Sequence, residues 1–151
     1  IGVQARWDNG MSARFTYAYT KEELPTDKQG NAVNNQYIPA RRHSLNVRYD
    51  YDRQFSARYG ISAGISGRLL SGTENEEYRN YYDVSQGTVR VSYPAYTMWK
   101  LSLVQRIGKA VKLTTALDNL FNYRPKYYYL NSPVTDGINF QIGLSVDIHE
   151  F

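Results

Sequence analysis

The sequence predicts an all-β fold, a transmembrane antiparallel β-barrel, on three observations. Apolar and polar residues alternate with a period of two through nearly the whole chain, and no stretch keeps a helical period for three turns. Short links of about two to four residues alternate with long ones of about 16 to 24, as turns and external loops do in outer-membrane barrels. Strands of about ten residues, tilted near 40°, rise about 25 Å, which matches the apolar band of such barrels.

The composition excludes several other classes of protein. The chain has 151 residues and a mean hydropathy of −0.59, and its 15 Tyr, 5 Phe and 2 Trp are too many for a disordered polymer. No run approaches the roughly 18 to 20 apolar residues that a membrane-spanning helix needs. Without cysteine the chain forms no disulfide framework and no thiolate metal site. The net charge of +4 is compatible with anionic partners such as phosphates or lipid headgroups.

Seven strands account for the alternation. They are expected at residues 2–7, 12–20, 42–50, 54–69, 96–106, 111–120 and 137–148. The long connections, expected to form external loops, cover residues 21–39, 70–93 and 121–136. Seven strands leave two unpaired edges whose backbone groups lipid cannot satisfy, so the rest of a larger barrel is expected upstream of Ile1.

The first two strands are separated by a short turn. Residues 2–7 place Val3 and Trp7 on one face, and residues 12–20 continue the same alternation. Between them, residues 8–11 read Asp-Asn-Gly-Met, and Asn and Gly are residues that tight turns favour. A hairpin is therefore expected at this point.

The third and fourth strands predict which face meets lipid. Residues 42–50 alternate clearly, and residues 51–53 are expected to turn the chain into the long strand 54–69. One face of that strand has no ionised residue. The opposite register would place Arg58 in the lipid, at a cost of about 2–4 kcal/mol near the midplane. The apolar face is therefore expected to meet lipid and the polar face to line the lumen.

The last three strands follow the same alternation. Residues 96–106 turn at Gly108 and Lys109 and return as residues 111–120, and residues 137–148 end the barrel. Across the strands, the same register directs Lys112 and five arginines toward the lumen: Arg6, Arg14, Arg48, Arg58 and Arg68.

The alternation alone leaves two alternatives open. A soluble β-sandwich also alternates apolar and polar residues, and an aromatic-rich sandwich would suit carbohydrate binding. A complete small barrel of about eight strands, serving as an adhesin or surface protein, would suit the chain length. Nucleic-acid binding is not expected, because the basic residues are spread along the strands rather than gathered in one stripe.

Three segments near the C-terminus carry a resemblance to a known family. Residues 117–123 read Leu-Asp-Asn-Leu-Phe-Asn-Tyr, and residues 96–103 precede them at the family's usual distance. Residues 141–148 fit the terminal assembly signal of outer-membrane barrels. The positions of that signal are Gln141, Gly143, Val146 and Ile148. The chain thus resembles the C-terminal section of TonB-dependent outer-membrane receptors, which are plugged 22-stranded transporters, and its strands would correspond to the last seven.

The end of the final strand departs from the family pattern. The family usually ends on an aromatic residue in the apolar row, but Phe151 falls on the opposite parity to Ile148. We expect the signal to end at Ile148 and three residues to trail.

The resemblance implies a function and a set of partners. It implies a multi-pass β-barrel in the outer membrane of a Gram-negative bacterium that takes up haem, an iron–siderophore or cobalamin, with no cofactor and no catalytic role. An oligosaccharide importer of similar build is left open. The implied partners are the rest of the barrel, its plug domain, the TonB complex that acts on the plug, the outer-membrane assembly machinery, lipopolysaccharide or other lipid, and the small nutrient ligand. The inward arginines would contact the plug.

The external loops mix aromatic rings with cations, a combination that stacks on flat or sugar-like ligands. The candidate ligand-binding residues are Tyr37, Tyr78, Arg79, Tyr81, Tyr82, Arg124, Tyr127 and Tyr128. Tyr93 is a further candidate. The alternative is that these residues only pack the loops, since tyrosine belts are common at barrel rims.

Two further groups at the external end carry weaker signals. His43 is expected on the lipid-facing side near the rim, and neither His43 nor His149 has a second ligand at a suitable spacing, so no metal site is expected. Arg41 and Arg42 are candidates for binding lipopolysaccharide phosphates, or alternatively form a solvated pair.

Overall fold

The computed structural model describes residues 1–21, 28–29, 41–80, 82–125 and 135–148. Its strands are β1 (Gly2–Arg6), β2 (Met11–Tyr19), β3 (His43–Ser56), β4 (Tyr59–Leu70), β5 (Thr73–Tyr78), β6 (Thr88–Tyr93), β7 (Tyr96–Ile107), β8 (Val111–Asp118) and β9 (Asn139–Val146). A short 3-10 helix, η1 (Val84–Gln86), lies between β5 and β6. In the described part of the chain, no helix is long and apolar enough to cross a membrane.

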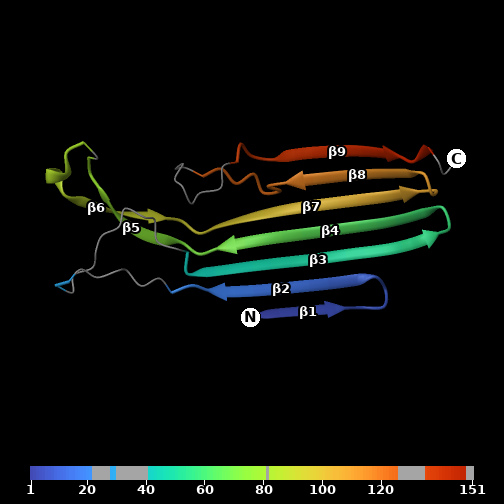
Figure 1. The fold of residues 1–151 in the computed structure, drawn as a ribbon, viewed down its shortest axis with the longest axis horizontal. Helices are drawn as coiled ribbons and strands as arrows, with labels where there is room; N and C mark the ends of the chain where they lie inside the picture. The colour runs from blue at the N-terminus through green and yellow to red at the C-terminus, as the bar shows by residue number, and fades with distance from the viewer. Residues whose placement is uncertain (22–27, 30–40, 81, 126–134, 149–151) are drawn as a thin grey trace.

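Seven of the strands form one antiparallel sheet. Its strand order is β1-β2-β3-β4-β7-β8-β9, with β1 and β9 at the two edges (Figure 1). Strands β5 and β6 form a separate hairpin that projects beyond one end of the sheet, while the short turns lie at the other end (Figure 1). The expected all-β antiparallel fold class is confirmed.

The turn between β3 and β4 lies further along the chain than the sequence predicted. It was expected at residues 51–53, but β3 continues to Ser56 and the chain turns at residues 57–58. Residues 51–53 carry on the strand alternation, and each of them has a partner on β4. Asp52 looked like a turn residue, but its carboxylate accepts hydrogen bonds from Ser62 and Arg106, which suits it to the strand.

The connection expected at residues 70–93 contains regular structure. Strands β5 and β6 pair along their whole length, and Arg90 forms an ion pair with Glu74 at 2.6 Å. Tyr93 is buried, with 3% of its surface exposed, and its hydroxyl donates to the Glu77 carboxylate. Strand β5 is polar from Thr73 to Glu77 and lacks the apolar alternation by which the other strands were recognised, whereas β6 alternates over a short stretch. The long connection predicted at residues 70–93 therefore contains a paired hairpin that the sequence did not predict.

The two faces of the seven-stranded sheet differ in polarity. Residues directly opposite each other in an antiparallel pair lie on the same face. The paired residues Val47, Gly67 and Trp99 mark an apolar face, and the next row, which includes Arg48 and Lys100, marks a polar face. The apolar face exposes large side chains, among them Val3, Phe15, Tyr49, Leu101, Ile107, Phe140, Ile142, Leu144 and Val146.

Very little hydrophobic surface is buried in the described residues. Only Leu70 and Tyr93 are buried hydrophobic residues there, with 8% and 3% of their surface exposed, whereas Ile142 and Leu144 are 67% and 68% exposed. A soluble β-sandwich buries one face of each sheet against the other sheet. Here neither face of the seven-stranded sheet is covered by a second layer in the described chain, which argues against the sandwich alternative.

Two glycines are required by close backbone or side-chain approaches. Gly10 has a φ of +88° in the β1–β2 turn, and a Cβ there would lie 1.9 Å from the carbonyl oxygen of Asp52. Gly67 lies under the indole of Trp99, and a Cβ would lie 2.6 Å from its ring atoms. The Trp99 ring also meets Phe121 edge-on, with centroids 6.1 Å apart.

Candidate functional site

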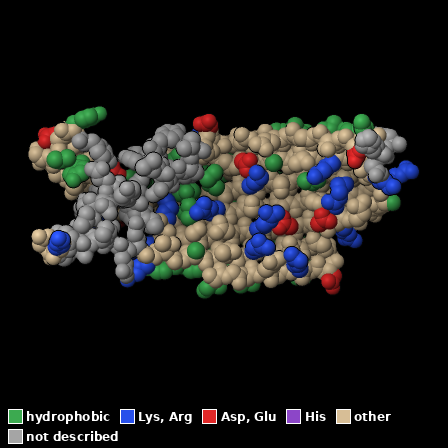
Figure 2. Space-filling view, in the orientation of Figure 1, with side chains coloured by type: hydrophobic (Ala, Val, Ile, Leu, Met, Phe, Trp, Pro, Cys, Tyr) green, Lys and Arg blue, Asp and Glu red, His purple; other side chains and the backbone are tan. Residues whose placement is uncertain are grey.

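The polar face carries most of the charged side chains of the seven-stranded sheet. The strand pairings place seven cations on it: Arg6, Arg14, Arg48, Arg68, Lys100, Arg106 and Lys112. The same pairings place three carboxylates there: Asp50, Asp52 and Asp118. Figure 2 shows this face, with Lys and Arg side chains gathered over the central strands and fewer acidic groups between them. The described strands therefore present a surface with an excess of positive charge.

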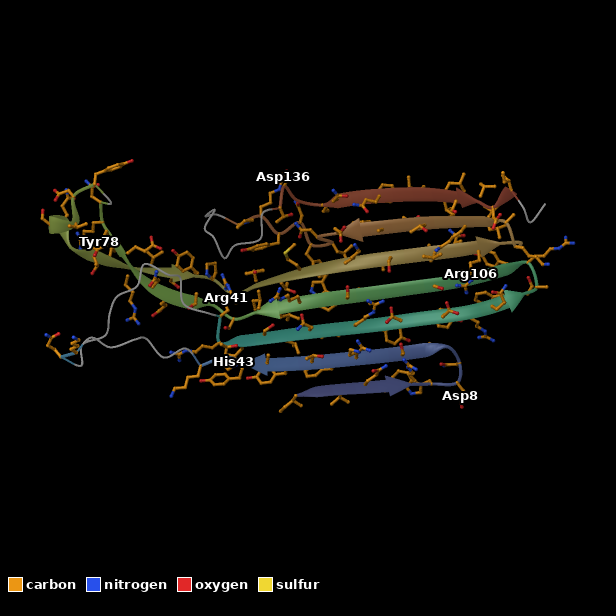
Figure 3. The ribbon with its side chains drawn as sticks, in the orientation of Figure 1. Asp8, Arg41, His43, Tyr78, Arg106 and Asp136 are labelled. Atoms are coloured by element: carbon orange, nitrogen blue, oxygen red, sulfur yellow. The ribbon has the colours of Figure 1, made fainter. Side chains whose placement is uncertain are left out.

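Three of the cations are paired with the three carboxylates. Arg106 of β7 donates two hydrogen bonds to Asp52 of β3, with Nη1–Oδ2 at 3.1 Å and Nη2–Oδ1 at 3.3 Å (Figure 3). The Nε of Arg48 lies 2.7 Å from Oδ2 of Asp50. The third pair is Lys100 with Asp118, whose Nζ and Oδ1 atoms are 3.1 Å apart. The first and third pairs link strands β3, β7 and β8 across the polar face, and the Arg48–Asp50 pair lies within β3.

The other four cations form no ion pair within the described ranges. Arg14 donates to the side-chain oxygen of Gln4 at 3.2 Å, which is a neutral acceptor. The remaining three are Arg6, Arg68 and Lys112. The excess charge of this face is therefore concentrated in these four side chains.

An open hollow of about 550 Å³ lies on this face. The charged residues that line it are Arg14, Arg48, Arg68, Lys100 and Asp118. Its polar lining includes Thr16, Asn46, Ser66, Asn119, Thr135 and Asn139. A smaller hollow of about 250 Å³ adjoins it, since Arg14 and Arg48 line both. Guanidinium groups beside hydroxyl and amide groups can bind oxyanions such as carboxylates.

The structure places four of the five arginines predicted to face inward on the polar face. Arg6, Arg14 and Arg48 belong to the paired rows of β1 to β3, and Arg68 lies opposite Asn46 on β4. Arg58 does not belong to this set, because the shifted β3–β4 turn contains it. Its prediction as a member of the inward row was wrong.

Sequence reasoning left out two polar-face cations, Lys100 and Arg106. The alternation of Trp99, Lys100 and Leu101 already places Lys100 opposite the apolar row, so the sequence contained a signal for it. The partnership of Arg106 with Asp52 depends on the register of three strands, which the sequence does not supply.

The described candidate ligand residues lie on two separate segments. Tyr78 ends β5 and is half-buried, and the Nε of the exposed Arg79 lies 3.5 Å from the carbonyl oxygen of Thr88. Tyr82 is fully exposed between β5 and β6. Arg124 follows β8 and lies beside Gly137. Tyr37, Tyr81, Tyr127 and Tyr128 lie outside the described residues.

Tyr93 and Arg41 have structural partners. The ring of Tyr93 is buried at the base of the β5–β6 hairpin. Arg41 Nη1 donates to the carbonyl oxygens of Ser71 and Pro94, at 2.6 and 2.8 Å, and its guanidinium lies 4.6 Å from the Tyr96 ring centroid. These contacts hold both ends of the hairpin (Figure 3), so Arg41 is not a solvated cation offered to lipid phosphates.

Tyr96 also contacts the segment that follows β8. Its ring stacks on Tyr123 with centroids 5.0 Å apart and an interplanar angle of 12°. Burial raises the pKa of Tyr123, and the neighbouring Tyr96 raises it further, whereas Arg41 acts in the opposite direction. The contacts from Arg41 to Tyr123 therefore connect two external segments.

Asn119 explains why the segment 117–123 is distinctive. Its backbone adopts a φ of +54°, a conformation that Asn tolerates better than most residues. Its side chain accepts a hydrogen bond from Tyr123 N and donates to Tyr123 O, both at 2.8 Å, and also donates to Thr135 Oγ1 at 3.0 Å. Asn119 is 3% exposed, so this buried side chain stabilises the turn that follows β8 through its hydrogen bonds.

His43 lies on the apolar face at the end of β3 (Figure 3), where its Nδ1 is 2.7 Å from the Tyr17 hydroxyl. Its ring centroid is 5.3 Å from that of Tyr19. In the described ranges no three His, Asp or Glu side chains gather in a way that would hold a metal ion.

The predicted assembly signal spans the last strand and its exit. Gln141 and Gly143 lie on the polar face, and Val146 ends β9 on the apolar face. Ile148 follows β9 and is 75% exposed. Residues 149–151 lie outside the described chain, so the departure at Phe151 stays a prediction.

Comparison with known proteins gives one match. A family model described as "TonB dependent receptor-like, beta-barrel" matches residues 1–120, which is more than half of the chain. No curated protein and no solved structure matches.

Proposed function

Because this chain belongs to the TonB-dependent receptor-like β-barrel family, we propose that it supplies part of the wall and external loops of a transporter for a scarce nutrient. The family is one of outer-membrane receptors and transporters rather than enzymes. We propose further that the barrel lies in the outer membrane of a Gram-negative bacterium and that its nutrient is haem, an iron–siderophore or cobalamin.

The observation that carries the proposal is the contrast between the two exposed faces of one sheet. The apolar face exposes a continuous set of large side chains, for example Phe140, Ile142 and Leu144. This suits contact with lipid, because lipid-facing positions of barrels are apolar and charge there is costly. The polar face carries the cations, and it would line a lumen filled by a plug domain.

The edges of the sheet support a larger barrel. In the described chain β1 and β9 pair on one side only. Within a bilayer, unpaired backbone N–H and C=O groups cost several kcal/mol each, so a sheet in lipid must close on itself. Further strands of the same barrel would provide the missing pairs. The alternative of a complete small barrel requires β1 to pair directly with β9.

The external end of the sheet would receive the nutrient. The β5–β6 hairpin and the long connections project from this end, opposite the short turns (Figure 1). Tyr78, Arg79 and Tyr82 offer rings and a cation there, and Arg124 adds a second cation. Such groups suit a flat or chelated ligand, such as haem, an iron–siderophore or cobalamin, by stacking and cation–π contact. An oligosaccharide would stack on the same rings and is the second candidate.

Uptake would draw on energy delivered by the TonB complex to the plug, and assembly would use the terminal signal at Gln141, Gly143, Val146 and Ile148. Lipopolysaccharide would surround the external rim of the apolar face. None of these partners requires a catalytic residue in the wall.

Uptake by intact cells tests the proposal. The complete natural protein would be expressed in a Gram-negative strain that lacks its own transporters, and uptake of labelled haem, ferric siderophores, cobalamin and a maltooligosaccharide would be measured with and without TonB. We expect TonB-dependent uptake of one metal chelate. Uptake of the oligosaccharide alone would favour the second candidate, and no TonB-dependent uptake of any of them would contradict the proposal.

The small-barrel alternative has its own measurement. The intact mass of the natural polypeptide, isolated from membranes in detergent, should be several times 17.4 kDa. If a 17.4 kDa species folds alone and shows a heat-modifiable shift in electrophoresis, the small barrel replaces the transporter.

A further inference from the structure

Two arginines lie directly opposite each other on the polar face. Arg14 of β2 is the cross-strand partner of Arg48 of β3. Like charges in directly opposite positions of an antiparallel pair destabilise it. Arg68 lies on β4 two residues beyond Ser66, the β4 partner of Arg48, and Lys100 is the next partner of Ser66. Arg48, Lys100 and Arg68 are thus neighbours of Ser66, and Arg14 lies one strand beyond Arg48.

The carboxylates of the described wall compensate only part of this charge. Arg48 is paired with Asp50, and Lys100 is paired with Asp118. The side chain of Arg14 reaches only the neutral oxygen of Gln4. In contrast, Arg106, which lies near the β7–β8 turn on the same face, binds both carboxylate oxygens of Asp52. Within this hollow, the cations without a carboxylate partner in the described chain are Arg14 and Arg68.

The space around these cations suits an incoming acidic group. The hollow has a volume of about 550 Å³ and lies open on the polar face of the sheet. Thr16, Asn46 and Asn139 add neutral hydrogen-bonding groups to its lining. An arginine pair with neutral donors around it can bind a carboxylate through two parallel N–H···O bonds.

We propose that the plug domain presents Asp or Glu side chains to the hollow formed by Arg14, Arg48 and Arg68. The proposal rests on the proposed function, since it requires a plug in the lumen. Repulsion between Arg14 and Arg48 acts at all times, whereas a transported nutrient occupies the site only briefly. The compensating group must therefore be a resident one, and the plug is resident. The cluster would hold the plug in register against β2, β3 and β4.

Chemical crosslinking in the complete protein tests this pairing. Replacing Arg14→Lys or Arg68→Lys keeps the positive charge and adds an amine, which a zero-length carbodiimide joins to a carboxylate within ion-pair distance. We expect a new amide bond between position 14 or 68 and an Asp or Glu of the plug, identified by mass spectrometry of linked peptides. The native Lys100–Asp118 pair, at 3.1 Å, is an internal control that the reagent enters the hollow. Arg58→Lys in the β3–β4 turn is the matched control and should not link to the plug.

The direction of a change in hydrogen-exchange rate gives an independent test. If a plug carboxylate binds Arg14, the variant Arg14→Gln should speed hydrogen exchange of the contacting plug segment by about tenfold, as expected for loss of a charged hydrogen bond. If no such carboxylate exists, Arg14→Gln removes repulsion from Arg48 and should leave exchange unchanged or slower. Arg58→Gln is the control for a change of charge alone.

The outcomes distinguish failure of the acidic plug contact from failure of the proposed function. Links from positions 14 and 68 only to wall carboxylates, or to none, together with unchanged exchange in Arg14→Gln, would overturn the acidic plug contact. Saturable stabilisation by added inorganic phosphate without a plug link would assign the hollow to a diffusible anion instead. A complete protein without a plug domain would overturn the proposed function itself.

Discussion

Arg106 of β7 reaches across the whole of β4 to bind Asp52 of β3. Its two terminal nitrogens lie 3.1 and 3.3 Å from the two carboxylate oxygens. The reach is possible because the β4 residues between them are small: Gly60 is the partner of Arg106, and Ser62 is the partner of Asp52. Arg106 Nη1 also donates to Ser62 Oγ at 2.6 Å. Three strands are thus joined by side chains as well as by the backbone ladder.

This pair should contribute a modest coupling energy. We expect a double-mutant cycle with Arg106→Gln and Asp52→Asn to give about 0.5–1 kcal/mol, because the two side chains are 36% and 64% exposed and solvent screens them. The free energy of unfolding of the complete protein, from urea titration in detergent micelles, measures it. A coupling of zero would show that the pair adds nothing beyond the two separate side chains.

The contact between Gly67 and Trp99 predicts a size limit on the apolar face. The variant Gly67→Ala should lower the free energy of unfolding by about 1–3 kcal/mol, since its Cβ would lie 2.6 Å from the indole and force it to move. Urea titration of the complete protein in detergent micelles measures this loss. Gly2→Ala is the control, because a Cβ there meets nothing closer than 3.9 Å. Equal effects of the two substitutions would contradict a specific role for Gly67.

Asn119 should be more sensitive than its neighbour Asn122, although both have positive φ angles of 54° and 53°. The variant Asn119→Ala removes three side-chain hydrogen bonds at a buried position, and we expect a loss of about 2–3 kcal/mol in the free energy of unfolding. Asn122→Ala carries the same conformational penalty at a positive φ, but the Asn122 side chain makes none of those three hydrogen bonds, so the loss should be smaller. Hydrogen exchange of the Tyr123 amide should quicken in the first variant only.

The sequence predicted the features that depend on local pattern. The alternation around Trp99 and Leu101 predicted the two faces, and the segment at Asn119 was recognised before its hydrogen bonds were known. The prediction from the sequence failed where a polar residue has a distant partner. Asp52 was predicted in a turn because its partner Arg106 lies 54 positions away and is not apparent from the local sequence. The same error misplaced Arg58. Pairings between strands require the register, which the chain does not encode locally.

The β5–β6 hairpin was not predicted, for a different reason. Strand β5 is polar from Thr73 to Glu77, so no apolar period marks it, and β6 alternates Val89, Val91 and Tyr93 with polar residues over a short stretch only. Tyr93 is buried where the hairpin joins the sheet, and its hydroxyl donates to the Glu77 carboxylate. A single tyrosine among fifteen gives no signal of this role in the sequence.

The helix η1 between β5 and β6 should loosen in acid. Hydrogen bonds from Ser85, and then from Gln86, lower the pKa of Asp83. A carboxyl whose folded pKa is depressed stabilises the folded form above its unfolded pKa of about 3.9, and that contribution is lost as the pH falls through the lower folded pKa. Hydrogen exchange of the Ser85 amide, corrected for intrinsic rate, should therefore quicken below about pH 4. Asp83→Asn should abolish this dependence, and its persistence in that variant would assign it to another group.

Arg41 should control the attachment of the β5–β6 hairpin to the barrel wall. Its guanidinium binds the carbonyl oxygens of Ser71 and Pro94, the two ends of the hairpin, and packs on Tyr96. The variant Arg41→Ala should leave those carbonyl groups without this donor and free the hairpin to move, with exchange of the β6 amides faster by about tenfold, as expected when a charged hydrogen bond is lost.

The neighbouring arginine supplies the matched control for this prediction. Arg42 is exposed, and the contact of its backbone carbonyl with Thr20 N at 2.8 Å survives replacement of its side chain. Arg42→Ala should therefore leave exchange in the hairpin unchanged, while Arg41→Lys, which keeps the charge but not the planar group, should give an intermediate rate. If Arg41→Ala and Arg42→Ala behave alike, the hairpin is held by Tyr93 and the backbone alone, and the path from Arg41 through Tyr96 to Tyr123 does not couple the two external segments.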